Sequence, residues 1–232
     1  MKLLLTSNGI SNPTIRAGLV DMLGKPIEES SALFVASGMH PFPGAGTRVV
    51  DVVRGTSNNQ LCGIGWESLG LLEPTALPSV RRDSWVPALE EADALLVYGG
   101  HVAFLAYWMR RSGMVELLPR LEHLVYVGVS AGAIVTTPFN CDAESNSASL
   151  PEESEIPTAT DGGLGFVDFT LWVHIGNPDP IFEDHTPENA AQFAREVGVR
   201  TYALDDASAL AVDGTDVTVL SEGRCEIFEP AG

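Results

Sequence analysis

The sequence predicts the α/β class with a mainly parallel sheet, because apolar strands alternate with helices along the chain. The segment Ala92–Tyr98 is apolar almost throughout and ends at Gly99-Gly100, as expected of a strand covered on both faces. Val102–Arg111 follows as a helix, with two arginines in its last turn and Gly113 just beyond it. Leu124–Val129 is the next apolar strand.

The other expected elements continue this alternation. We expect a long polar loop at Phe139–Gly163, where no hydrophobic period is visible, and a shorter Pro/Gly loop at Pro41–Gly46. A hairpin-like pair, Val217–Ser221 with Cys225–Phe228, should end the chain around Glu222-Gly223. The remaining expected elements are the strands Lys2–Thr6, Ser31–Ala36, Phe166–His174, Tyr202–Leu204 and Ser208–Val212, and the helices Thr14–Leu23 and Thr186 to about Val197.

Composition and charge limit the classes of partner. The 232 residues are of single-domain size, and 45% of them are hydrophobic, which excludes wholesale disorder. With 13 basic and 31 acidic residues the net charge is −18, which repels phosphate backbones and anionic membrane surfaces. We therefore expect neither a nucleic-acid partner nor a membrane partner.

Cysteine usage and the first residues indicate the compartment. Cys62, Cys141 and Cys225 are far apart and form no Cys-x-x-Cys pair, so neither a disulfide framework nor a zinc ribbon is expected. The start, MKLLLTSNG, lacks the long apolar stretch and the cleavage site of a signal peptide. These features predict a cytoplasmic protein.

The strongest chemical pattern lies in Leu124–Ala133, which reads LVYVGVSAGA. Gly128 and Gly132 flank Ser130 in a G-x-S-x-G pattern, with a strand before it and small, apolar residues after it. A nucleophile elbow needs this context, because the serine sits in a sharp turn and residues two positions away must be small. Ser130 is the predicted nucleophile, and N–H groups at the following helix start could stabilise an oxyanion. The alternative is a glycine-rich turn without chemistry.

Two further groups are expected at the same edge of the sheet. Gly99-Gly100 ends the neighbouring strand, so it should lie beside Ser130, where its uncovered N–H groups could supply a second oxyanion donor. A plain strand-to-helix turn would have the same sequence. Among the five histidines, His174 is the leading candidate for the base because it closes a strand at this edge. His185, in an acidic loop before a helix, is second.

The carboxylate that orients the base is expected between the serine and the histidine, in the long polar loop. This gives the chain order serine, acid, histidine. Most carboxylates of the loop must be solvated, since one suffices for a triad. The candidates are Asp142, Glu144, Glu152, Glu153, Glu155 and Asp161.

Three segments together resemble the peptidase E, or aspartyl dipeptidase, family of serine peptidases, which is related to the cyanophycinases. They are Leu95–Gly113 (LLVYGGHVAFLAYWMRRSG), Tyr126–Pro138 (YVGVSAGAIVTTP) and Gly163–His174 (GLGFVDFTLWVH), and the tail Tyr202–Gly214 (YALDDASALAVDG) is also similar. The resemblance implies one three-layer, flavodoxin-like domain over residues 1–232. Its fold resembles class I glutamine amidotransferases, with serine in place of their cysteine nucleophile.

The resemblance also implies an activity, the cleavage of dipeptides with an N-terminal aspartate, without a metal or other cofactor. By matching motifs, Ser130 is the nucleophile and His174 the general base, and Gly100 and the N–H of Ala131 form the oxyanion hole. The partner would be a small acidic peptide, whose carboxylate needs a cation, and Arg195 is the first candidate. Arg110 and Arg111 are further candidates, and a monomer or a homodimer is expected.

Two features depart from the family. The family usually has asparagine after the paired glycines, whereas this chain has His101, which would border the site and alter the choice of substrate. The acid is also not aligned. Counting forward from the serine favours Asp142 or Glu144, and counting back from the histidine favours Glu152 or Glu153. We prefer Asp142 because it lies close to the start of the loop.

These departures favour an alternative function, a non-catalytic, amidotransferase-like binding module that kept the elbow. The intact Ser130 and His174 argue against it. A hydrolase or esterase of broader substrate range is a third possibility. Reaction with a fluorophosphonate separates the first two readings, because only an activated serine is labelled.

Overall fold

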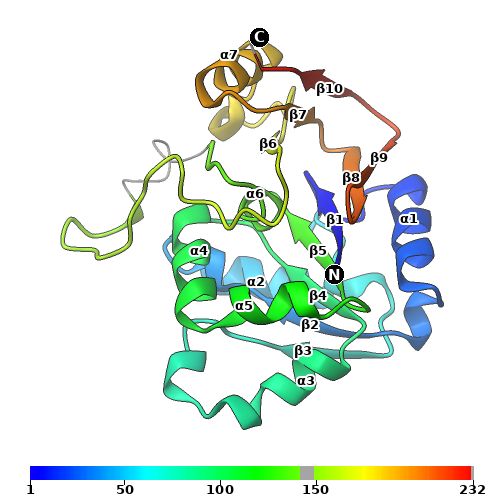
Figure 1. Ribbon diagram of the computed structural model, residues 1–232. Helices are drawn as coiled ribbons and strands as arrows, with labels where there is room; N and C mark the ends of the chain where they lie inside the picture. The colour runs from blue at the N-terminus through cyan, green and yellow to red at the C-terminus, as the bar shows by residue number, and fades with distance from the viewer. Residues whose placement is uncertain (142–148, 231–232) are drawn as a thin grey trace.

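The computed structural model describes residues 1–141 and 149–230 (Figure 1), and within them a seven-stranded sheet forms the centre. Five of its strands run parallel, and the last two, β8 and β9, are antiparallel to their neighbours. In sheet order the strands are β3 (Ser68–Leu71), β2 (Ser31–Val35), β4 (Ala94–Val97), β5 (Val125–Val129), β1 (Lys2–Thr6), β8 (Ser208–Asp213) and β9 (Asp216–Ser221). The predicted mainly parallel sheet is confirmed.

The central strands are apolar because both faces of the sheet are covered. On β1, Leu3 and Leu5 belong to one hydrophobic cluster, whereas Leu4 belongs to the other, as the two-residue period of a strand requires. Helices α1 and α2 contribute to the second cluster, and α3 to α6 to the first, so the predicted three layers are confirmed. The helices are α1 (Pro13–Leu23), α2 (Ala45–Arg54), α3 (Val86–Glu91), α4 (Val102–Arg111), α5 (Met114–Leu117), α6 (Ala131–Ile134) and α7 (Pro187–Val197).

A second, three-stranded sheet lies beside the carboxyl edge of the first (Figure 1). Its order is β10 (Cys225–Phe228), β7 (Thr201–Leu204) and β6 (Thr170–Trp172), and α7 packs against β7 and β10. Thr186 caps α7 by accepting a hydrogen bond from the N–H of Asn189.

Two expectations about strands are corrected. The C-terminal hairpin is wrong, because β9 pairs with β8 across a turn at Gly214, which has a φ of +61°, and β10 pairs with β7 instead. Glu222-Gly223 lies in a loop whose next residue, Arg224, donates its N–H to Asp205 at 2.6 Å. The strand expected at Phe166–His174 is shorter than predicted, because only Thr170–Trp172 pairs with β7.

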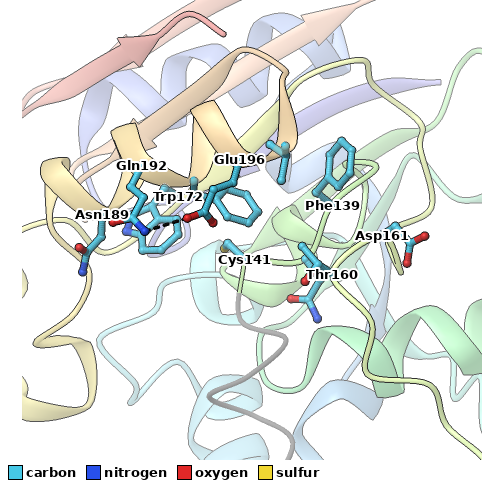
Figure 2. A pocket seen from close by; sticks show the side chains of 11 residues that line it. Phe139, Cys141, Thr160, Asp161, Trp172, Asn189, Gln192 and Glu196 are labelled. Atoms are coloured by element: carbon cyan, nitrogen blue, oxygen red, sulfur yellow. Dashed lines mark hydrogen bonds between the residues drawn. The ribbon is translucent and has the colours of Figure 1, made fainter. Parts of the chain in front are cut away.

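The segment after α6 contains no α-helix or β-strand, as expected, over its described parts, 139–141 and 149–163. Arg110 of α4 fixes its end, donating to the carbonyl oxygens of Gly162 and Gly163 at 3.0 and 2.6 Å. Between this segment and α7 lies a cavity of about 630 Å³, lined in part by Trp172 and Glu196 (Figure 2). Within the described residues, no helix is long and apolar enough to cross a membrane.

Close packing between β4, β5 and α6 depends on two glycines. A Cβ at Gly128 would overlap the backbone of Gly132, and a Cβ at Gly132 would overlap the carbonyl oxygen of Val97 on β4. Below them, the buried hydroxyl of Tyr126 donates to the carbonyl of Gly132 at 2.7 Å. The requirement for small residues two positions from Ser130 is therefore confirmed, and it comes from backbone-to-backbone contact.

This packing predicts that Gly132→Ala destabilises the protein. Because the obstructing atom belongs to the backbone of a central strand, relief requires a backbone shift, and we expect a loss of about 1–3 kcal/mol in the free energy of unfolding. Urea unfolding measures it. The matched control is Gly46→Ala on α2, where a Cβ meets nothing within 4 Å. Equal stability of the two variants would contradict the close-packing argument.

Candidate active site

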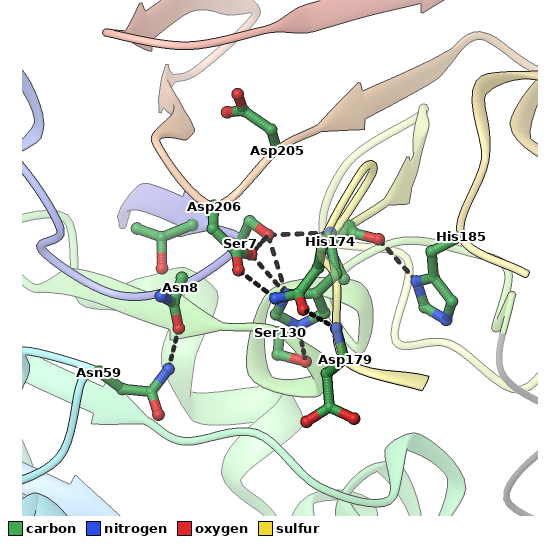
Figure 3. Close-up of polar contacts among 12 residues, drawn as sticks. Ser7, Asn8, Asn59, Ser130, His174, Asp179, His185, Asp205 and Asp206 are labelled. Carbon is green, nitrogen blue, oxygen red and sulfur yellow. Dashed lines mark hydrogen bonds and ion pairs between the residues drawn. The ribbon is translucent and has the colours of Figure 1, made fainter. Parts of the chain in front are cut away.

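Ser130 stands at the end of β5, in the sharp turn that leads into α6. Its backbone has a φ of +52° and a ψ of −118°, and its N–H donates to the carbonyl of Thr6 on β1 at 3.0 Å. Gly99 lies beside it as predicted, since a Cβ at Gly99 would be 3.1 Å from the Cβ of Ser130. The turn therefore presents the serine hydroxyl at the carboxyl edge of the sheet (Figure 3).

His174 provides the predicted partner of this hydroxyl. Its Nε2 lies 2.9 Å from the Oγ of Ser130. The histidine follows β6 by two residues, has a φ of +63° and is 5% exposed. Its ring stacks on Phe182 with centroids 4.2 Å apart. The choice of His174 agrees with this contact, but the expected position at the end of a main-sheet strand is wrong, because β6 belongs to the second sheet.

The carboxylate bonded to the histidine is Asp206, which the sequence analysis missed. Its Oδ1 lies 2.6 Å from Nδ1 of His174 (Figure 3). Its Oδ2 accepts a hydrogen bond from Asn177 at 2.5 Å. Asp206 lies between β7 and β8, so the chain order is serine, histidine, acid, and not the expected order with the acid in the middle.

The six carboxylates expected for this role fall into two groups. Asp142 and Glu144 lie outside the described residues. Within the described residues, the hydrogen bonds and ion pairs of the His174 ring lead to Ser7, Ser130 and Asp206, and none leads to the other four loop acids. Those four are Glu152, Glu153, Glu155 and Asp161.

The charge state of Asp206 determines the proton positions. Burial by itself raises the pKa of Asp206, but the hydrogen bond and charge of His174, with hydrogen bonds from Ser7 and Asn177, hold that pKa below its usual range. An ionised Asp206 can only accept, so Nδ1 of His174 carries the ring proton and donates it. The Nε2 lone pair then faces the hydroxyl of Ser130, as general-base chemistry requires.

The predicted oxyanion donors lie next to the serine. Gly100 has a φ of +122°, and a Cβ there would overlap the carbonyl of Gly38, so this backbone path requires glycine. The N–H of His101 donates to the carbonyl oxygen of Gly38 at 2.8 Å and is therefore not an oxyanion donor. The N–H groups of Gly100 and Ala131 make no hydrogen bond with another described residue, so both are available to an incoming oxygen.

Neither His101 nor Arg195, the two residues predicted to bind substrate, makes a hydrogen bond to Ser130 or His174 within the described residues. His101 is buried and caps α4, its Nδ1 accepting from the N–H of Phe104 at 3.2 Å. Arg195 is exposed on α7, and its side chain makes no hydrogen bond or ion pair with the described residues. Of the further candidates, Arg110 fixes the loop end, and Arg111 bonds to the hydroxyl of Tyr107 at 3.0 Å. The described contacts therefore bring no arginine to Ser130.

His185 lies beside the site without contacting the serine. Its ring centroid is 6.2 Å from that of His174, and its Nδ1 donates to the carbonyl of Val173 at 2.7 Å. The described residues contain no group of three or more His, Cys, Asp or Glu side chains that could hold a metal ion. Burial raises the pKa of the Cys62 thiol to about 12, so this cysteine is no thiolate nucleophile at neutral pH.

The hydrogen-bonded chain from Ser130 to Asp206 can activate a hydroxyl for attack on a carbonyl carbon. A serine needs a base to remove its proton, and the base needs an orienting group. Both are present at hydrogen-bond distance, and the cavity of Figure 2 contains neither the serine nor the histidine among its lining residues. The chemistry therefore belongs to the carboxyl edge of the main sheet.

Proteins of similar sequence include named peptidases. The chain is 26% identical over 156 residues to an uncharacterized peptidase of Listeria monocytogenes, covering 65% of this chain and 72% of the relative. It is 30% identical over 145 residues to Peptidase E of Streptomyces coelicolor, covering 60% of this chain and 57% of that protein. This chain therefore aligns with little more than half of the Streptomyces protein.

Solved structures share the fold. A Listeria monocytogenes protein provisionally named peptidase E superposes with a TM-score of 0.66 at 18% identity, covering 96% of this chain and 98% of the other. A peptidase from an acI-B1 Actinobacterium gives a TM-score of 0.63 at 16% identity, covering 98% and 90%. The model of peptidase family S51 matches residues 3–220. This match spans nearly the whole chain, so the chain belongs to peptidase family S51.

Proposed function

We propose that this chain is a serine-type dipeptidase that hydrolyses small peptides with an N-terminal aspartate. The observation that carries the proposal is the chain of contacts from Ser130 Oγ to His174 Nε2 and from His174 Nδ1 to Asp206, at 2.9 and 2.6 Å. Membership of family S51 supports peptide hydrolysis as the reaction.

The proposed mechanism is acyl transfer. Ser130 Oγ attacks the peptide carbonyl carbon while His174 Nε2 takes the hydroxyl proton, and the N–H groups of Gly100 and Ala131 bind the oxyanion. The imidazolium then gives that proton to the leaving amine as the peptide bond breaks. Water, deprotonated by the same nitrogen, hydrolyses the acyl-enzyme and frees Ser130. Asp206 stays ionised throughout and keeps the Nδ1 proton in place.

The preference for an aspartyl residue rests on the resemblance to peptidase E. A net charge of −18 repels an anionic substrate at long range, so a local cation must attract its carboxylate. Arg195 remains one candidate.

A dipeptide panel tests the function. We expect purified protein to hydrolyse Asp-Leu faster than Leu-Leu, equally with and without a chelator, and to be labelled by a fluorophosphonate. Ser130→Ala should abolish labelling and lower turnover by about 10⁴- to 10⁶-fold while the thermal unfolding transition persists. Turnover of the variant above a tenth of the wild-type value would exclude Ser130 as the nucleophile.

A second set of variants identifies the acid. Asp206→Asn should lower kcat by about 10⁴-fold, because an amide can donate to Nδ1 and so favours the wrong tautomer of His174. The neighbouring control is Asp205→Asn, since Asp205 bonds to Ser208 and Arg224 and not to the histidine. Asp142→Asn and Glu144→Gln should keep most of the activity. If one of these two is the inactive variant, the assignment of Asp206 fails.

The lowered pKa of Asp206 also predicts a pH dependence of stability. A carboxylate whose pKa is lower in the folded state stabilises the fold above its unfolded pKa of about 3.9, and this contribution is lost as the pH falls through the folded pKa. The urea midpoint of the wild type should therefore fall in acid. Asp206→Asn lacks this titration, so its midpoint should fall less over the same range. Parallel pH profiles would contradict the argument.

A further inference from the structure

Ser7 contacts two members of the proposed triad at once. It directly follows β1, is fully buried, and donates its own N–H to the carbonyl of Ser208 on β8 at 3.3 Å. Its Oγ lies 3.0 Å from the backbone N of His174, 2.8 Å from Oδ1 of Asp206 and 3.3 Å from Nδ1 of His174 (Figure 3). Three polar atoms of the site thus converge on one hydroxyl.

The chemistry of these groups assigns the direction of each hydrogen bond. The backbone N–H of His174 can only donate, so Ser7 Oγ accepts from it. The ionised Asp206 can only accept, so the single hydroxyl proton of Ser7 goes to Oδ1. The same Oδ1 accepts the Nδ1 proton of His174. The hydroxyl therefore ties the backbone of the base to the carboxylate that orients its ring.

We propose that Ser7 is a positioning residue of the hydrolase site, an inference that rests on the proposed function. It holds Asp206 against Nδ1 and also secures His174 in its unfavourable backbone conformation, with a φ of +63°. Without the hydroxyl, the buried N–H of His174 loses its partner and Asp206 loses one of its three side-chain donors. The imidazole would then no longer be held in line between Asp206 and Ser130.

The test is Ser7→Ala, compared with Ser30→Ala. Ser30 is also fully buried, and its hydroxyl donates to the carbonyl of Pro26 at 2.8 Å, before β2 begins. For Ser7→Ala on Asp-Leu we expect kcat to fall about 10- to 100-fold, the range for loss of a hydrogen bond to a charged group, with little change in KM. The far-downfield proton resonance of the His174 Nδ1–H should shift or broaden. Ser30→Ala should leave kcat and the resonance unchanged.

Two further variants keep the test decisive. Ser7→Thr retains a hydroxyl and should recover kcat and the resonance relative to Ser7→Ala. Should Ser7→Ala fail to fold, Ser7→Cys fills the space with a weaker hydrogen-bonding group and should show the same losses. A folded Ser7→Ala or Ser7→Cys with wild-type kcat and an unchanged resonance overturns the positioning role.

The resonance separates failure of this inference from failure of the proposed function. If the wild type neither cleaves dipeptides nor reacts with a fluorophosphonate, the proposed function fails. The resonance of His174 in wild type and Ser7→Ala still reports whether Ser7 orders the histidine and the carboxylate. If the wild type is active and the resonance is insensitive to Ser7, the function stands and the role of Ser7 is refuted.

Discussion

The end of β1 is the constraint on which the site depends. The carbonyl of Thr6 accepts the N–H of Ser130, and the hydroxyl of Ser7 holds both His174 and Asp206. Because β1 lies between β5 and β8, its last residues reach the serine on one side and the aspartate on the other. The second sheet brings β6, and with it the histidine, over the same strand end. Ser130, His174 and Asp206, which are far apart in the sequence, therefore all bond to the consecutive residues Thr6 and Ser7.

Backbone strain is concentrated at this point. Among the described non-glycine residues, Ser130 and His174 are the two with positive φ, and each such conformation costs roughly 1–3 kcal/mol. Each is held by a backbone N–H bond to the end of β1. The buried hydroxyl of Tyr126 secures the start of α6 from below. These two strained residues are also the ones whose side chains meet, with Nε2 of His174 2.9 Å from Oγ of Ser130.

The sequence predicts the serine because its placement is local, since a G-x-S-x-G pattern after an apolar strand specifies its own turn. The sequence also selects the right histidine but places it at the end of a strand of the main sheet, whereas it follows β6 of the second sheet by two residues. Asp206 could not be found this way. It precedes β8, which is antiparallel to β1, and only that reversal brings the start of a strand to the catalytic edge. The run YALDDASAL shows two short strands around an acidic pair but not their relative direction.

The departure at His101 has a structural explanation that bears on the non-catalytic alternative. An asparagine after the paired glycines can cap the following helix with its side-chain oxygen, and the Nδ1 of His101 performs that task for α4. Using Nδ1 as an acceptor leaves the proton of the neutral ring on Nε2. The N–H of His101 still bonds to Gly38, so the path of Gly100 is preserved. Two observations favoured a non-catalytic module, His101 in place of asparagine and the unaligned acid. The first is explained by the cap on α4 and the second by the carboxylate bonded to His174, so the hydrolase remains the better account of the site.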